Sequence, residues 1–129
     1  MAMTEQQARE LIENYLEAYN LFEVGDMLAC LHPDVAFENV SDGVVTHQTE
    51  GKAAFEVQAN QATTLFMERN QHMLAFRFQN DHAEADIQFF AITAVDWPDS
   101  WKAGTILELT GQSVFTFRDS LIASIRDIN

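Results

Sequence analysis

Basic residues are scarce in this sequence, and their scarcity excludes some partners. Seven lysines and arginines stand against 20 aspartates and glutamates, which gives a formal net charge of −13 over 129 residues. Nucleic acids and anionic membranes are bound through clustered basic side chains, so we expect neither as a partner. No apolar run approaches the roughly 18 residues that a membrane-spanning helix needs.

Cysteine is almost absent as well. Cys30 is the only one, so no disulfide can form within the chain. The first residues, Met1 to Gln7, have neither the basic nor the apolar stretch of a signal peptide. Both features favour the cytoplasm as the location of the protein.

Glycine and histidine are few and are not arranged in known binding motifs. The five glycines form no dinucleotide- or phosphate-binding loop, and the four histidines have no metal-ligand spacing. We therefore expect neither a metal ion nor another cofactor. The chain is nevertheless 47% hydrophobic, which is enough for a packed core, and its length fits one domain over residues 1–129.

Helical and strand periodicities follow one another along the chain. Apolar residues recur at helical spacing over residues 4–22, and two further helices are expected at 27–31 and 49–66. A period of two, typical of strands, marks residues 35–39, 72–78, 85–91 and two runs within 104–128. Helices followed by consecutive strands predict an α+β fold, because a parallel sheet would need helices between the last strands.

The stretch 104–128, which follows a loop from Asp96 to Trp101, predicts a long hairpin that turns at Arg118, Asp119 and Ser120. Large apolar side chains occupy both ends of one face of its first strand, and Gly111 and Ser113 lie between them. Small residues in the middle of an apolar face leave room, and a glycine there often marks a bend. The pattern predicts a bent sheet with a pocket in its concave face.

Several short motifs occur in a familiar order. They are Tyr15–Asn20, Gly25–Asp26, Leu31–Asn39, Gly51–Phe55, Gly111–Phe117 and Ile122–Asp127. In this order the chain resembles the SnoaL-like branch of the nuclear-transport-factor-2-like superfamily. The resemblance implies a cone, in which a curved antiparallel or mixed sheet wraps around N-terminal helices and an apolar pocket, commonly in a homodimer. The superfamily includes polyketide cyclases, ketosteroid isomerases, epoxide hydrolases, dehydratases and pocket proteins without chemistry, so the fold leaves the activity open.

The resemblance to ketosteroid isomerases concerns three positions. Tyr15 matches the tyrosine that donates a hydrogen bond to the substrate oxygen, Asn39 matches the carboxylate base, and Ser113 matches the neutral acid. An asparagine cannot accept the substrate proton at neutral pH, and a serine is a weaker donor. We therefore expect Asn39 and Ser113 to orient a ligand, and we do not expect steroid isomerisation.

Two other residues are candidates for proton transfer. His72 begins the face of its strand that we assign to the pocket, although a lone histidine there is more often a wall residue. Asp127 shares a face with Ile125, and burial among aromatic rings would raise its pKa, whereas at a frayed C-terminus it would be solvated. With Tyr15, these two form the predicted catalytic set. The predicted ligand-binding residues are Tyr19, Phe37, Asn39, Phe76, Phe89, Ser113 and Phe115, and with Leu74 and Phe117 the phenylalanines are expected to ring a cavity around Ser113.

The sequence therefore predicts a protein that binds a small, largely apolar, oxygenated molecule. If it is an enzyme, the chemistry is cofactor-free cyclisation, isomerisation or dehydration. A non-catalytic ligand-binding or sensory module and a dimeric scaffold are the alternatives. Phe90, Ile92 and Val114 fall on the face opposite the core, and such an exposed apolar patch predicts a homodimer through the outer face of the sheet.

Overall fold

The computed structural model describes residues 3–98 and 100–129, so Met1, Ala2 and Asp99 of the expected terminus and loop lie outside it. The described part forms three helices and six strands. Their bounds are α1 Glu5–Asn20, α2 Val24–Ala29, β1 Leu31–Ser41, β2 Val44–Glu50, α3 Lys52–Thr63, β3 Phe66–Gln79, β4 His82–Thr93, β5 Ile106–Arg118 and β6 Leu121–Ile128. The α+β class is confirmed.

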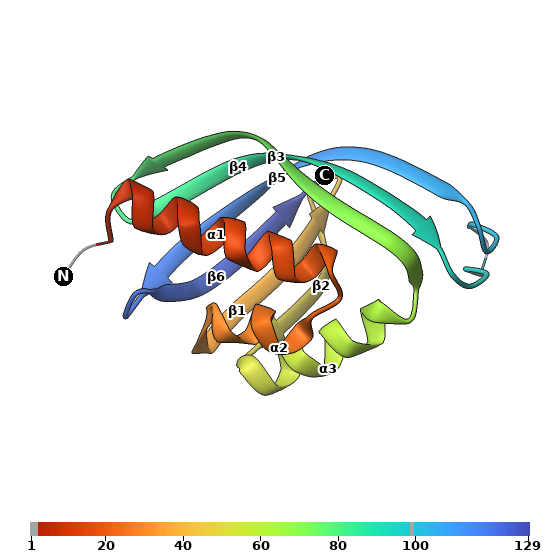
Figure 1. The fold of residues 1–129 in the computed structure, drawn as a ribbon, viewed down its shortest axis with the longest axis horizontal. Coiled ribbons are helices and arrows are strands. Elements are labelled where there is room, and N and C mark those ends of the chain that lie inside the picture. The colour runs from red at the N-terminus through yellow and green to blue at the C-terminus, as the bar shows by residue number, and fades with distance from the viewer. Residues whose placement is uncertain (1–2, 99) are drawn as a thin grey trace.

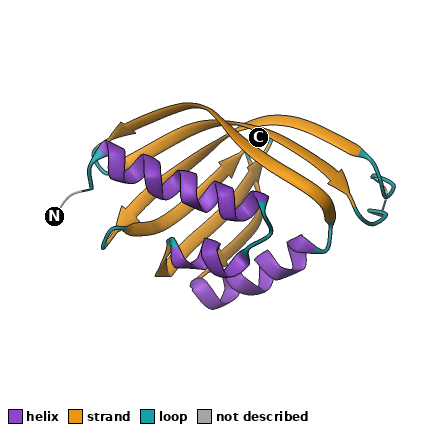
Figure 2. Cartoon of the chain, in the orientation of Figure 1, coloured by secondary structure: helices purple, strands orange, loops and turns teal. Residues whose placement is uncertain are grey.

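The six strands form one curved sheet in the order β2-β1-β6-β5-β4-β3. Neighbours are antiparallel except β1 and β6, which pair in parallel near the middle of the sheet. All three helices lie on one face of the sheet, and the β4–β5 hairpin extends past them at one side of the molecule (Figures 1 and 2). The other face carries no helix, so the sheet has a covered inner face and an open outer face.

Helix α1 follows the predicted pattern. Thr4 caps its N-terminus, because its hydroxyl accepts from the Gln7 backbone N–H while the Gln7 side chain accepts from the Thr4 backbone N–H. Its apolar stripe is buried, and two hydrogen bonds between Asn20 and the backbone of Gln71 join the end of the helix to β3. The last turn of α1 therefore lies above the first half of β3.

Two-residue turns join β1 to β2, β3 to β4 and β5 to β6. Asp42–Gly43, Asn80–Asp81 and Asp119–Ser120 all have positive φ angles at both positions. That geometry matches the right-handed twist of the flanking strands, and Asn, Asp and Gly tolerate it best. The turns expected at 80–81 and 118–120 are confirmed.

One strand was not predicted, and the bounds of two helices were wrong. β2 was not expected, because most of its side chains are exposed and it shows no alternation to read. The third helix was expected from 49 but begins at Lys52, after Gly51 with a φ of +88°. The second helix was expected at 27–31, but Leu31 and His32 already belong to β1.

The core lies between α1, α2, α3 and the half of the sheet beneath them. It is built from fully buried aliphatic and aromatic side chains, including Ile12, Leu31, Val35, Phe115, Ile122 and Ile125. Within residues 3–98 and 100–129, no helix is both long and apolar enough to cross a membrane.

Candidate functional site

A row of three polar side chains crosses the inner face of the sheet. In the backbone register, Asp127 of β6 lies directly beside Asn39 of β1 and beside Ser113 of β5. All three positions follow the alternation of buried residues on their strands. Strands that are far apart in the sequence thus bring these residues together.

Asp127 is the only charged residue in the row. The Ser113 hydroxyl donates a hydrogen bond of 2.7 Å to Oδ1 of Asp127. Burial in the protein raises the pKa of Asp127 to about 6, although the Ser113 hydrogen bond acts to lower it. The carboxyl group therefore changes its protonation state close to neutral pH, as a proton-transfer group must.

A cavity of about 200 Å³ opens over this row. Its polar lining comes from Tyr19, Asn39, Gln71, Thr110, Gln112, Ser113, Asp127 and Asn129, and its apolar lining from Ile87, Phe89, Leu109, Gly111 and Ile128. The cavity thus lies at one end of the inner face, beside the core.

Tyr19 enters the cavity from the last turn of α1. Burial raises the pKa of its hydroxyl to about 12; the Arg69 charge acts to lower that pKa and the Asp127 charge to raise it. Tyr19 and Asp127 line the same cavity. The hydroxyl remains protonated at neutral pH and can donate a hydrogen bond to a ligand.

The side chain of Asn39 is held by one hydroxyl group of β2 and one of β1. Its amide nitrogen donates to Oγ1 of Thr46 at 2.8 Å and lies 3.4 Å from Oγ of Ser41. Thr46 is the extra residue of a bulge in the β1–β2 pairing, which moves its hydroxyl next to Asn39. With the nitrogen engaged on that side, the amide oxygen is the group that Asn39 can offer to a ligand.

Gly111 is needed because the end of β6 lies against it. A Cβ atom at this position would lie 2.7 Å from the backbone oxygen of Ile128, closer than real contacts allow. Asn129 is tied down beyond it by hydrogen bonds to Val40, Asp42 and Ser41. The end of β6, and with it Asp127, is therefore anchored, contrary to the frayed terminus that was the alternative.

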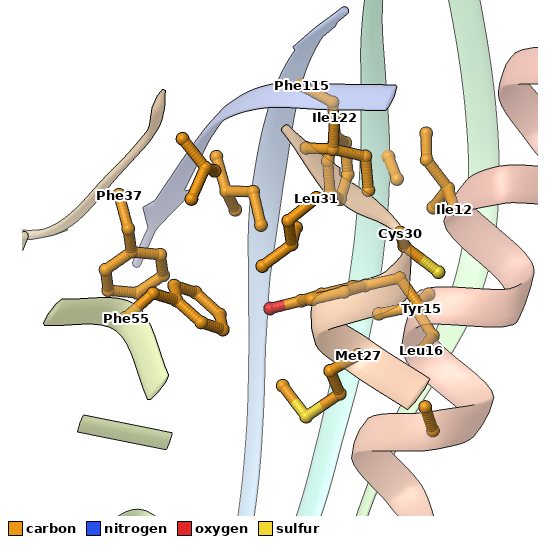
Figure 3. Packing of buried hydrophobic residues seen from close by; sticks show 14 of the residues in the cluster. Ile12, Tyr15, Leu16, Met27, Cys30, Leu31, Phe37, Phe55, Phe115 and Ile122 are labelled. Atoms are coloured by element: carbon orange, nitrogen blue, oxygen red, sulfur yellow. The ribbon is translucent and has the colours of Figure 1, made fainter. Parts of the chain in front are cut away.

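Tyr15, which was expected to act with the cavity residues, lies in the core. It is 5% exposed, and its ring packs against Phe55 and Phe115 with both centroid distances at 6.5 Å. Figure 3 shows its hydroxyl pointing into this cluster towards Phe55. Burial, with a smaller contribution from the Asp127 charge, raises its pKa well above the usual value for tyrosine. Among the lining residues, Tyr19 takes the place that the sequence suggested for Tyr15.

The inner-face placement of His72 was wrong. The pairing of β3 with β4 shifts between Met73 and Ala75, and this bulge reverses the alternation of side chains. Before the bulge, Arg69, Gln71 and Met73 face inwards and His72 is exposed; after it, Phe76 and Phe78 face inwards. His72 therefore does not line the cavity.

The expectation that six large apolar side chains surround a cavity at Ser113 was also wrong. Of the six side chains, only Phe89 lines the cavity. Phe37 and Phe115 are core residues, Phe76 and Phe117 pack against the core, and Leu74 is 56% exposed. The cavity lies on the other side of Ser113, where Gly111 and Leu109 continue β5.

Gln71 and Arg69 are inner-face residues that the sequence did not reveal. Gln71 lines the cavity, and Arg69 lies two positions before it with 2% exposure. The alternation of these two residues with Asn70 could have indicated their common face. The inner face of the strand was instead assigned from Phe76, which lies beyond the bulge. In the described part of the chain, no three His, Cys, Asp or Glu residues gather closely enough to hold a metal ion.

No family model and no curated protein matches the sequence, but solved structures match the fold. A proposed polyketide cyclase from Xanthomonas campestris pv. campestris shares 22% identity, with a TM-score of 0.83 over 96% of this chain and 90% of that one. An LEH-like epoxide hydrolase from M. tuberculosis shares 15% identity, with a TM-score of 0.76 over 95% and 82% of the two chains. A protein of ketosteroid isomerase-like fold from Catenulispora acidiphila shares 11%, with a TM-score of 0.74 over 92% and 83%.

These likenesses establish the fold. The chain shares the α+β cone fold of these structures, which is the fold that its resemblance to the SnoaL-like branch implied. At such low identities the chemistry must be argued from the cavity itself.

Proposed function

We propose that this protein binds a small, largely apolar, oxygenated molecule in the cavity and catalyses cofactor-free proton transfer on it. Asp127 is the proton-transfer group. The observation that carries this proposal is a carboxyl group with a pKa of about 6 in the wall of a cavity that Tyr19 also lines. A base and a hydrogen-bond donor around one cavity are the two groups that such a reaction needs.

The reaction class follows from the two groups. Asp127 in its ionised form takes a proton from a carbon next to a carbonyl group, and the electrons of that C–H bond move onto the carbonyl oxygen. The Tyr19 hydroxyl donates a hydrogen bond to this oxygen as its negative charge develops. The proton then returns from Asp127 to another atom of the same molecule. Cyclisation, isomerisation and dehydration can all proceed in this way without an oxidant or reductant.

Steroid isomerisation is not the reaction we propose. Asn39 replaces the base of that reaction, and its amide cannot take a proton at neutral pH. The cavity of about 200 Å³ is also below the roughly 300–1,000 Å³ typical of sites for drug-sized ligands. A cavity of about 150 Å³ accommodates benzene, so this one suits a ligand with a single ring or a short chain.

A non-catalytic ligand-binding module is the second candidate. Three residues of the lining, Asn39, Gln71 and Asn129, carry side-chain amides, whereas the amide of Gln112 is hydrogen-bonded to Asp86 on the outer face. Amides hold ligands through hydrogen bonds and do not transfer protons at neutral pH. Such a lining would serve binding without chemistry, as in a sensory domain.

Matched variants separate these two functions once a ligand is found by screening small oxygenated hydrophobic compounds. Asp127→Asn keeps the shape of the side chain but removes the base, so turnover should fall about 10²- to 10⁴-fold while binding persists. His72→Gln is the control, because His72 is exposed and off the cavity. Ser113→Phe should fill the cavity and abolish binding. Binding by wild type without turnover of any ligand would favour the binding module.

We also propose that a second copy of this chain covers the outer face of the sheet. Phe90 and Ile92 of the expected patch lie there, and Ile106, 62% exposed, extends the patch directly beside Ile92. Val114, its third expected member, lies further along β5 beside Glu84. Glu108 lies beside Phe90 and Glu68 beside Ile92, so burial of the apolar side chains must outweigh the repulsion between two chains that each carry a charge of −13. Light scattering should give twice 14.6 kDa for wild type and a monomer for Ile106→Glu, whereas Val57→Glu, on the exposed side of α3, should remain dimeric. A monomeric wild type at micromolar concentration would contradict this.

A further inference from the structure

Arg69 differs from every other arginine of the chain. Four of the five arginines are at the surface, and each pairs with a carboxylate: Arg9 with Glu13, Arg77 with Glu84 and Asp86, Arg118 with Asp34, and Arg126 with Glu38. Arg69 is only 2% exposed, and no carboxylate of the described residues lies within ion-pair distance of it. In a chain with 20 acidic residues, the buried arginine is thus the one that lacks an acidic partner.

The position of Arg69 is fixed by the end of α1. Its Nε donates a hydrogen bond of 2.8 Å to the backbone oxygen of Tyr19. Its guanidinium carbon lies 3.8 Å from the centre of the Tyr19 ring and 4.5 Å from that of Phe22. These contacts explain how the side chain is held, but Nη2 is buried and has no hydrogen-bond acceptor. A buried charge with an unused donor is costly unless something else compensates for it.

The Arg69 charge acts on the cavity through Tyr19. No lysine, arginine or histidine is among the residues that line the cavity, and Asp127 is its only charged member. Arg69 contacts the ring of Tyr19, and Gln71, two residues further along the same strand face, lines the cavity. The guanidinium is therefore the cation placed to attract a negative charge that enters beside Tyr19.

We propose that the cavity selects small ligands that carry an acidic oxygen and holds them as the oxygen anion, which the Tyr19 hydroxyl binds and the unpaired charge of Arg69 stabilises. Arg69 is thus a specificity-determining and positioning residue. It acts through Tyr19 and does not itself exchange protons with the ligand.

This inference rests on the proposed function and deepens it. Proton removal by Asp127 turns the carboxylate neutral and leaves a negative oxygen on the ligand, so the charge moves from Asp127 towards Tyr19 and Arg69. Loss of the Asp127 charge also removes one of the influences that raise the pKa of Tyr19. The tyrosine therefore becomes a stronger donor at the step in which the oxygen anion forms.

The protonation of Asp127 should control the binding of an anion. Asn39 of β1 and Ser113 of β5 lie beside Asp127 in the sheet, and its charge acts on Tyr15 and Tyr19 of α1. Arg69 of β3 contacts Tyr19, and exposed His47 of β2 is in register beside Asn39. Ionised Asp127 repels an anion in the cavity, whereas neutral Asp127 can donate a hydrogen bond to it. Anion affinity should therefore rise as the pH falls through about 6.

Benzoate and benzamide form a suitable pair of probes, because they have the same size and differ in charge. Calorimetric titration at about pH 5, where a simple carboxylic acid is still mostly ionised, should show benzoate binding to wild type about tenfold more tightly than benzamide. Benzoate affinity should fall about tenfold by pH 7.5, and Asp127→Asn should abolish this dependence.

Substitution of Arg69 tests the source of the selectivity. Arg69→Met should weaken benzoate binding about tenfold or more and leave benzamide within about twofold, and Arg69→Lys should restore part of the difference. Arg9→Met is the matched control, because Arg9 also lies over an aromatic ring, that of Phe76, but is exposed and paired with Glu13. Thermal unfolding shows whether each variant is folded. If Arg69→Met does not fold, the inference is tested by the relative affinities of wild type for benzoate and benzamide and by the pH dependence of benzoate binding.

The outcomes separate the two proposals. Equal affinity for both probes, a preference for benzamide, or a benzoate affinity that is the same in folded Arg69→Met would overturn the role of Arg69 and leave the proposed binding function intact. Failure of wild type to bind either probe at millimolar concentration would overturn the proposed function for ligands of this class, and this inference with it.

Discussion

The core and the cavity meet on the same three strands, and in each strand the step from one to the other is two residues. On β5 Phe115 is in the core and Ser113 is in the cavity, and on β6 the corresponding pair is Ile125 and Asp127. On β1 Phe37 packs in the core, and Asn39 lines the cavity.

Helix α1 repeats this division one turn apart, because Tyr15 is buried in the core and Tyr19 reaches the cavity. The packed half is closed by α2, α3 and aromatic rings, as in the edge-to-face contact of Phe37 with Phe55. The cavity half has polar side chains at the same depth. The core residues and the proposed site thus occupy adjacent rows of one face, and matched substitutions in the two rows should differ in their effects on stability and on ligand binding.

The largest contrast in stability is expected between Phe115 and Ser113. Phe115 is 1% exposed and packs against Tyr15, so Phe115→Ala should lower the free energy of unfolding by about 3–5 kcal/mol. Ser113→Ala removes one hydrogen bond to Asp127 beside an existing cavity, so its cost should be at most about 1.5 kcal/mol. Urea unfolding measures both values. Similar costs for the two variants would mean that the row at Ser113 belongs to the core.

Much of the fold could be predicted from the sequence, because its signals are local. The capping box at Thr4 and Gln7 and the turns at Asn80–Asp81 and Asp119–Ser120 are set by the residues themselves. β2 could not be predicted, because its exposed side chains leave no periodicity. Its place in the sheet comes from its pairing with β1.

The candidate site was predicted less completely, because it depends on long-range register. Asp127, Ser113, Asn39, Tyr19 and Phe89 all line the cavity. His72 was misplaced because one bulge after Met73 reverses the faces of β3, and alternation cannot show where a bulge occurs. Tyr15 and Tyr19 share one helix face, and only the tertiary packing decides which of them is enclosed and which borders the cavity.

The second contrast concerns the pH dependence of stability. The pKa of Asp127 rises from 3.8 to about 6 on folding, so the folded state binds this proton more tightly than the unfolded chain. Its contribution to stability is complete below pH 3.8 and is lost as the pH rises through about 6, which amounts to about 3 kcal/mol at pH 7.

Asp127→Asn should remove this loss, so the variant should gain on wild type by up to about 3 kcal/mol between pH 4 and pH 7. Glu56→Gln, at an exposed position of α3, is the control and should follow wild type over the same range. Chemical unfolding at several pH values gives the difference. A constant difference between Asp127→Asn and wild type would show that the carboxyl group is solvated and that its pKa is not raised.

The smallest effect on stability is expected when the hydroxyl group of Tyr15 or Tyr19 is removed. The Tyr15 hydroxyl makes no side-chain hydrogen bond with the described residues, so Tyr15→Phe should change the free energy of unfolding by no more than about 1 kcal/mol and leave ligand affinity unaltered. Tyr19→Phe keeps the ring that contacts Arg69 but loses the hydrogen bonds of the hydroxyl with the Gln71 and Arg69 side chains, so it should cost up to about 1.5 kcal/mol. It should nevertheless weaken the binding of an oxygen anion about tenfold, since the donor in the cavity is lost. Benzoate titration of both variants beside thermal unfolding makes the comparison, and a loss of affinity in Tyr15→Phe but not in Tyr19→Phe would return the donor role to Tyr15.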